Sequence, residues 1–229
     1  MQTLPFYVYA TFSLTVLLTI WFLYKAANYS KPLLVLISLW VVVQSVLGVN
    51  GFYRVSTTPP RLLLLVLPPM ILLVVALVTP GGRRRIDSLD LKTLTLLHII
   101  RIPVEIVIYW LFLNKAVPEV MTFEGRNFDL LSGLSAPFVW YFGFAKGGVN
   151  KWLLLIWNVV CLGLLLNITM IAMLTVATKL EPFAFDSSKL AMVYFPFLLL
   201  PGCLVPIVLF SNLAAIRQLV KKRAFAIIA

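Results

Sequence analysis

The stretch His98-Ile99-Ile100-Arg101-Ile102-Pro103-Val104-Glu105 places charge inside an apolar run from Leu91 to Leu113. An Arg in the middle of a bilayer costs roughly 2.5–3.5 kcal/mol even on insertion scales. At about 100° per residue, His98, Arg101 and Glu105 fall within an arc of roughly 60° on one helix face. Pro103 also removes a backbone donor and leaves a carbonyl one turn earlier without its partner. The stretch therefore predicts a polar centre inside a bundle of membrane-spanning helices.

The composition supports a membrane protein without a separate soluble domain. The chain has 229 residues, of which 62% are hydrophobic and 12% are charged, whereas soluble domains are nearer half apolar and a quarter charged. Seven spans of ~20 residues would use ~140 residues and leave only short loops. We therefore expect an all-α polytopic membrane protein in which residues 1–229 form a single transmembrane domain.

Seven apolar runs are predicted as transmembrane helices, at residues 5–24, 32–50, 61–79, 91–113, 127–144, 152–176 and 190–216. The 127–144 segment is the weakest, because Asp129 and Pro137 lie in its first half. It either crosses the membrane or forms a short re-entrant helix, which is tolerated where protein buries it. Prolines and a glycine inside the spans are predicted hinges: Pro68, Pro69, Pro103, Pro201 and Gly202.

The distribution of basic residues predicts the orientation of the chain. The net charge is +11, but Lys and Arg are spread over short loops between spans, which is typical of topology signals and not of a nucleic-acid-binding patch. Twelve of the 19 Lys and Arg residues fall on the side of the C-terminus, and six fall on the side of the N-terminus. The excess is expected in the cytoplasm, which puts the N-terminus outside and the C-terminus inside.

The first three and the last three predicted spans show a weak sequence similarity to each other. The start of the second span, at residues 31–37, matches the start of the sixth, at 151–157, and Pro68-Pro69 has a counterpart in Pro201-Gly202. Either two Leu-rich spans align by chance, or the spans form a 3+1+3 parallel repeat, in which paired interruptions indicate a mid-membrane binding site. At the level of topology only, the arrangement resembles parallel-repeat sugar and vitamin transporters and seven-helix rhodopsins. The seventh span has no interior Lys for retinal, and no Pro-Gln dipeptide occurs.

Six polar residues of the predicted spans are candidates for ligand binding or proton relay: His98, Arg101, Glu105, Asn127, Asp129 and Asn158. Arg101 can pair with Glu105 four residues later. That pair either locks helices together, or Arg101 receives an anion while Glu105 and Asp129 titrate and His98 relays protons. A single histidine does not make a typical zinc site, which takes three or four protein ligands. A site made of His98, Glu105 and Asp129 is the only metal arrangement to consider, and neither a metal nor a cofactor is expected.

The leading functional prediction is binding or transport of a small anionic or proton-coupled solute in a plasma or bacterial inner membrane. The alternatives are a structural or signalling subunit of a membrane complex and, third, an intramembrane enzyme that modifies lipid. Besides the bilayer itself, the expected partner is anionic lipid at the cytoplasmic face. Its contacts would be two basic groups: Arg83, Arg84 and Arg85, and Lys221, Lys222 and Arg223. An oligomer is compatible with the sequence.

Overall fold

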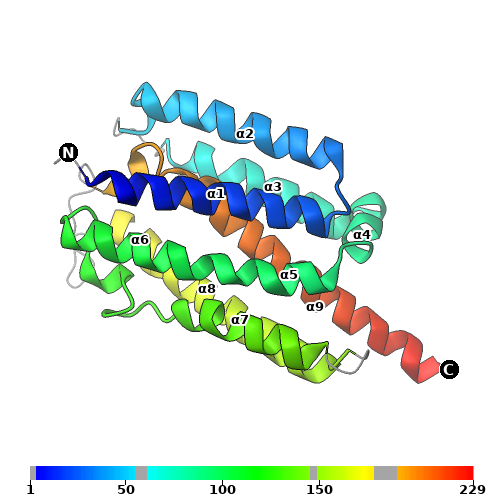
Figure 1. Ribbon diagram of the computed structural model, residues 1–229. Coiled ribbons are helices and arrows are strands. Elements are labelled where there is room, and N and C mark those ends of the chain that lie inside the picture. Colours follow the sequence, from blue (N-terminus) through cyan, green and yellow to red (C-terminus); the bar gives the residue numbers. More distant parts are fainter. Residues whose placement is uncertain (1–3, 55–60, 145–148, 178–189, 229) are drawn as a thin grey trace.

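The computed structural model describes residues 4–54, 61–144, 149–177 and 190–228. The described residues are 81% helix and contain no strand. The long helices lie side by side and alternate in direction, so that the N- and C-termini lie at opposite ends of the bundle (Figure 1). The all-α fold is therefore confirmed.

The first three long helices are α1 (Phe6–Ala26), α2 (Lys31–Val49) and α3 (Leu63–Val78). Helix α2 lies at the edge of the bundle (Figure 1), and its only buried residues are Gln44 and Gly48. Its remaining Val and Leu side chains are mostly exposed, which suits a helix that faces lipid rather than protein. Pro68 and Pro69 lie inside α3.

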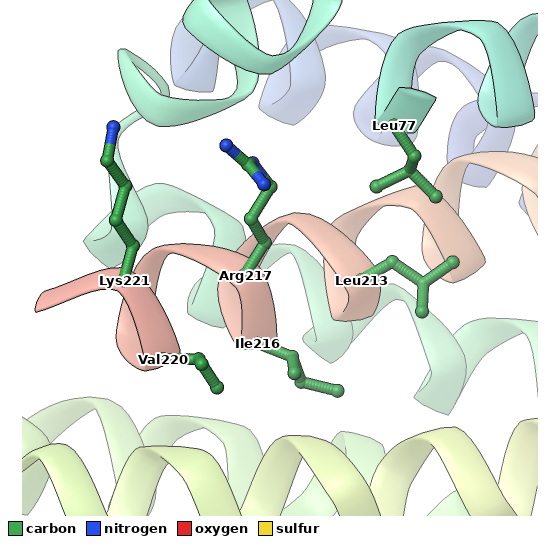
Figure 2. A pocket seen from close by; sticks show the side chains of 6 residues that line it. All are labelled: Leu77, Leu213, Ile216, Arg217, Val220 and Lys221. Atoms are coloured by element: carbon green, nitrogen blue, oxygen red, sulfur yellow. The ribbon is translucent and has the colours of Figure 1, made fainter. Parts of the chain in front are cut away.

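Helix α4 (Pro80–Asp87) follows α3 at a bend of 87°. Thr79 caps α4 by accepting a hydrogen bond from the Gly82 N–H at 3.1 Å, and Pro80 occupies the first helical position, where its missing N–H is harmless. The far end of α4 is held to the C-terminal helix. There Asp87 pairs with Arg217 and Lys221, whose side chains extend toward α4 (Figure 2).

The fourth predicted span is a single run, Leu91–Leu113. It consists of α5 (Leu91–Leu97), a 3₁₀ turn (His98–Ile100) and α6 (Arg101–Leu113). Asp90 caps α5, since its carboxylate accepts the Thr93 N–H at 3.0 Å. The 3₁₀ turn lies just before Pro103, which cannot donate to the helix.

The second half of the chain contains α7 (Leu130–Gly143), α8 (Lys151–Ala177) and α9 (Val205–Ile228). The seventh predicted span, at 190–216, is wrong at both ends. A short 3₁₀ turn occupies Ala191–Val193, and the continuous run starts only at a π-helical turn, Leu200–Leu204, which leads into α9. Pro196 lies before the helix, Pro201 lies in its first turn, where the missing N–H is tolerated, and no Pro or Gly ends the helix at 216.

Five described helices are long and apolar enough to cross a membrane: Phe6–Ala26, Lys31–Val49, Leu91–Leu113, Lys151–Thr175 and Leu200–Lys221. The bent pair α3–α4 makes a sixth if it counts as one broken span, and α7 has only 14 residues. The chain is therefore a multi-pass membrane protein by length and composition of its helices. Seven complete spans, the orientation and the internal repeat stay predictions.

The π-helical turn lies where α2 and α3 pack against the beginning of α9. The Trp40 indole N–H of α2 donates to the Gly202 carbonyl at 2.8 Å. A Cβ atom on Gly202 would come within 2.5 Å of Leu65 of α3. The predicted hinge residues Pro201 and Gly202 thus lie in a tightly packed contact, and a side chain at position 202 would require Leu65 to shift.

Candidate functional site

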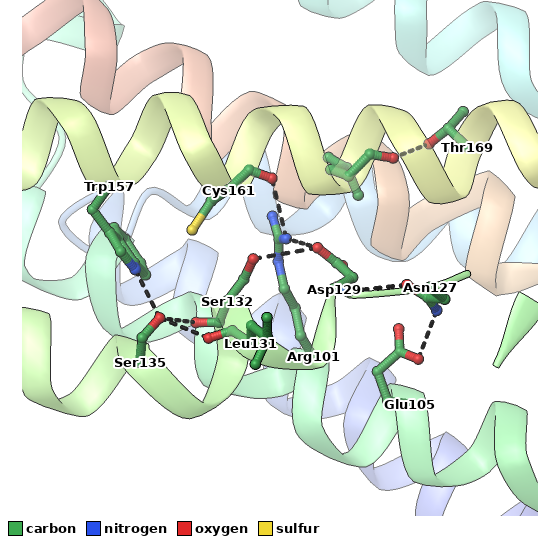
Figure 3. Close-up of polar contacts among 11 residues, drawn as sticks. Arg101, Glu105, Asn127, Asp129, Leu131, Ser132, Ser135, Trp157, Cys161 and Thr169 are labelled. Atoms are coloured by element: carbon green, nitrogen blue, oxygen red, sulfur yellow. Dashed lines mark hydrogen bonds and ion pairs between the residues drawn. The ribbon is translucent and has the colours of Figure 1, made fainter. Parts of the chain in front are cut away.

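The centre of the bundle contains a buried ion pair between Arg101 and Asp129 (Figure 3). Arg101 is 2% exposed, and it begins α6. Its Nη1 contacts the Asp129 carboxylate directly before α7, and also donates to the Cys161 carbonyl of α8 at 3.3 Å. One guanidinium therefore joins α6, α7 and α8.

Helix α7 begins well inside the bundle rather than at its end (Figure 1). Its 14 residues span ~21 Å, less than the ~30 Å of a hydrocarbon core. The chain before α7 is mostly irregular, yet Val120, Met121, Thr122 and Asn127 are buried. Irregular backbone inside a membrane protein is tolerated where protein covers it. The irregular segment and α7 together run from one end of the bundle to the other (Figure 1), whereas a re-entrant helix would return to the end from which it entered.

Gly133 allows α7 to approach the start of α6 at backbone distance. A Cβ atom on Gly133 would lie 2.9 Å from Ile102 Cγ1 and 3.0 Å from the Ile102 backbone nitrogen. Both distances are closer than real Cβ atoms normally come. This close approach holds Asp129, four residues earlier on the chain, against Arg101.

Asn127 links the second buried carboxylate to the ion pair. Its Nδ2 donates to Glu105 Oε2 at 2.7 Å and to the Met121 carbonyl at 3.0 Å, while its Oδ1 accepts the Asp129 N–H at 3.0 Å. Glu105 is 2% exposed. Arg101 thus pairs with Asp129 rather than with Glu105, and Glu105 receives an uncharged amide donor.

The guanidinium of Arg101 keeps one edge unused. Its Nε and Nη2 are buried and have no hydrogen-bond partner within the described part of the chain, whereas Nη1 faces Asp129. Nε–H and Nη2–H point the same way from a planar guanidinium, which is the geometry that binds two oxygens of one anion. A buried charged donor without a partner is costly, so this edge is the part of the site suited to a ligand.

His98 lies one turn before Arg101 and is fully buried. Its ring packs edge-on against Trp157 of α8, with ring centroids 5.1 Å apart, and the Trp157 indole N–H donates to the Ser135 hydroxyl at 2.9 Å. Neither imidazole nitrogen has a hydrogen-bond partner among the residues described. The imidazole is therefore held by aromatic packing, and its polar atoms remain available.

Asn158 of α8 lies one turn before Cys161, whose carbonyl accepts from Arg101. Its Nδ2 donates back to the Leu154 carbonyl at 2.8 Å, and its Oδ1 lacks a partner in the described ranges. Leu154 packs with Leu91 and Ala215 where α5, α8 and α9 meet. Because residues three or four apart share a helix face, Asn158 lies one turn from that contact.

Asn212 is a candidate that the sequence interpretation missed. It is fully buried in α9, and neither atom of its amide has a partner among residues that the structure describes. It lies one turn before Ala215, on the face that meets α5 and α8. The sequence could have identified it, because Asn212 is an Asn inside an apolar run, which is the feature that made Asn158 a candidate.

The described residues include no group of three or more His, Cys, Asp and Glu that could hold a metal ion. Comparisons of the chain with protein-family models, curated proteins and solved structures found no match. The functional assignment therefore rests on the geometry around Arg101.

Proposed function

We propose that this protein binds a small anionic solute at Arg101 and carries it across the membrane together with a proton. The observation that carries the proposal is the unused Nε–Nη2 edge of a guanidinium that is 2% exposed. Ionisable groups inside membrane spans are rare and typically mark substrate, ion or proton pathways. A carboxylate or phosphate group would supply the two acceptors that this edge lacks.

Charge balance supports coupling to a proton. Asp129 already neutralises Arg101, so an arriving anion would leave the buried site with net negative charge. A proton that enters with the anion removes this excess, because a buried unpaired charge is far more costly than a neutral group. Glu105 is the proposed proton carrier, since its hydrogen-bond donor is the neutral Asn127 amide, and Asp129 is the second titrating group.

The short helix α7 also supports a binding site at mid-membrane. Solute sites of secondary transporters are typically built by discontinuous helices whose N-termini point at anionic groups near the bilayer centre. Here α7 starts beside Arg101 and follows an irregular buried segment. We further propose seven passes with the N-terminus outside and the C-terminus in the cytoplasm of a plasma or bacterial inner membrane, with the 3+1+3 repeat as their origin.

The test uses the purified full chain in liposomes that enclose a pH-sensitive dye. Acetate, lactate and inorganic phosphate are added outside as probes, and acidification of the interior beyond that of empty liposomes reports anion–proton entry. The double variant Arg101→Gln/Asp129→Asn removes the guanidinium without leaving a buried unpaired carboxylate, and it should abolish entry. Glu105→Gln should allow anion binding but not proton entry. Arg61→Gln serves as the matched control, because it removes a cation just before α3, outside the ion-pair site.

Two results would contradict the proposal. A folded Arg101→Gln/Asp129→Asn variant that still transports would show that the ion pair only clamps three helices together, as a structural subunit would require. Failure of every small carboxylate and phosphate to raise the thermal stability of the wild-type chain at millimolar concentration would remove the anion site itself.

A further inference from the structure

An open groove of about 440 Å³ lies on the flank of the bundle, at the end occupied by α4 (Figure 2). It is formed between the end of α3 and the middle of α9. The side chains that line it are Leu77, Leu213, Ile216, Arg217, Val220 and Lys221. Four of these are apolar and two are cationic, so the groove has an apolar floor and a basic end.

The basic end of the groove has more positive than negative charge. Arg217 Nε lies 3.1 Å from Asp87 Oδ1, and Lys221 Nζ lies 2.7 Å from Asp87 Oδ2. Two cations thus share one carboxylate, and the Lys221 side chain remains 50% exposed. The nearby α4 adds the exposed side chains of residues 83–85, which are all arginine. A negatively charged group would find unneutralised charge here.

The groove lies at the end of an apolar helical run. The apolar span Leu200–Lys221 includes the first part of α9 and ends at Lys221, and α4 turns 87° away from α3 at the same end. Lys221 therefore lies at the limit of the apolar span, Arg217 and Ile216 lie about one turn deeper, and Leu213 lies about one turn deeper still. An amphiphile with an anionic head and an apolar tail fits this order of side chains.

We propose that this groove is a binding site for an anionic phospholipid. The phosphate contacts Arg217 and Lys221, and an acyl chain lies along Leu77, Leu213 and Ile216. Basic residues next to a membrane span attract anionic headgroups, and long basic side chains reach from an apolar surface to the headgroup level. A soluble phosphate would use the cations but not the apolar floor. The site is independent of the solute site at Arg101.

Asp87 competes with the lipid phosphate for the same two cations. Both of its carboxylate oxygens face them in the structure, so binding of a phosphate requires these contacts to be shared or released. Neutralising Asp87 should therefore strengthen lipid binding rather than weaken it. A carboxylate that was merely part of an ion-pair lock would not have this effect.

The test measures lipid retained on the detergent-purified full chain by native mass spectrometry, with phosphatidylglycerol and phosphatidylcholine supplied in equal amounts. We expect the wild-type chain to retain phosphatidylglycerol preferentially. Arg217→Gln and Lys221→Gln should each lower the preference about fivefold, and Asp87→Asn should raise it. Arg61→Gln, which removes a cation near the α2–α3 connection, should leave it unchanged.

Equal retention of the two lipids by the wild-type chain overturns the proposal, and this outcome does not depend on the folding of any variant. An unchanged preference in folded Arg217→Gln/Lys221→Gln also overturns it. Glycerol phosphate should displace little lipid, because it lacks an acyl chain, and complete displacement at equal concentration would show that the apolar floor is not used. The experiment does not measure transport, so a negative result for lipid binding would not contradict the proposed solute site at Arg101.

Discussion

At the scale of single residues, the ion pair between Arg101 and Asp129 is the feature with the largest energetic consequence. A buried pair contributes little net stability, because desolvation of both charges roughly offsets their attraction. Removing one partner is different, since it strands the other charge in the protein interior. Because two nitrogens of the Arg101 guanidinium have no partner within the described chain, we infer a binding role. Removal of the guanidinium should change the free energy of unfolding.

Arg101→Gln should destabilise the protein by about 3–5 kcal/mol, because Asp129 loses its counter-charge inside the bundle. Arg101→Gln/Asp129→Asn should recover most of that loss, since two amides can hydrogen-bond to each other. Unfolding of both variants in detergent, followed by circular dichroism, gives the comparison. Equal stabilities of the single and double variants would mean that Asp129 is not buried against Arg101.

Asn212→Leu should stabilise the protein, because it replaces a buried amide that has no partner within the described chain with an apolar side chain of similar size. The expected gain is about 1–3 kcal/mol in unfolding free energy. If the amide belongs to the solute pathway, the same variant should transport more slowly in the liposome assay. A variant that is both less stable and fully active would exclude this role.

At the scale of elements, the packing of α7 against α6 positions the site. Gly133 permits the contact with Ile102, and the ion pair forms a single turn away. Gly163 of α8 provides a natural comparison, since a Cβ atom there would meet nothing within 4 Å.

Gly133→Ala should destabilise the protein by about 1–3 kcal/mol, as overpacking in a tight contact does. It should also weaken anion binding, because Asp129 moves with α7. Gly163→Ala should be neutral or stabilising by up to ~1 kcal/mol, since alanine is the better helix former. Thermal unfolding of the two variants side by side checks the difference, and equal effects would contradict the tight contact.

The contact between α4 and α9 should make stability depend on pH in acid. Burial raises the pKa of the Asp87 carboxyl, but hydrogen bonds and attraction from Lys221 and Arg217 outweigh burial and hold that pKa below its ordinary value of 3.8. The folded state therefore binds fewer protons than the unfolded state. Its added stability is fully present above about pH 4 and is lost as pH falls through the folded pKa.

Unfolding midpoints measured in detergent between neutral pH and about pH 3 test this dependence. Asp87→Asn should reduce the acid-dependent loss of stability, whereas Glu119→Gln, an exposed carboxylate at the other end of the bundle, should leave it in place. Identical pH profiles for the wild-type chain and Asp87→Asn would show that this ion pair does not contribute.

Most helices were predictable from the sequence, because long apolar runs in a membrane protein indicate helices. The spans predicted at 5–24, 32–50, 91–113 and 152–176 agree with helices within two residues at each end. Helix α4 was not predicted, since Pro80-Gly81-Gly82 indicates only the end of a helix, while the cap by Thr79 starts another. Helical spacing predicted Glu105 as the partner of Arg101, with Asp129 or Asn158 as additional partners. The actual pairing with Asp129 depends on the approach of α7 at Gly133, which helical spacing does not encode.

At the scale of the whole molecule, the positions of the basic residues and of the termini define a sidedness. Helix α4, with residues 83–85, lies at the same end of the bundle as the C-terminus, and the N-terminus lies at the other end (Figure 1). Because basic loops are retained in the cytoplasm, this end should face inward.

Epitope tags on both termini test the orientation. In intact cells, external protease should remove the N-terminal tag and spare the C-terminal tag, and permeabilised cells should lose both. Protection of the N-terminal tag in intact cells would reverse the predicted topology.

The separation of the two termini limits how copies of this chain can be joined. On the proposed topology, with the N-terminus outside and the C-terminus in the cytoplasm, a short peptide linker between the C-terminus of one copy and the N-terminus of the next would begin on one side of the bilayer and have to end on the other. A head-to-tail tandem would therefore insert its second half upside down. A concatenated pair of parallel subunits requires an additional hydrophobic helix within the linker, whereas a single fused reporter at either end does not.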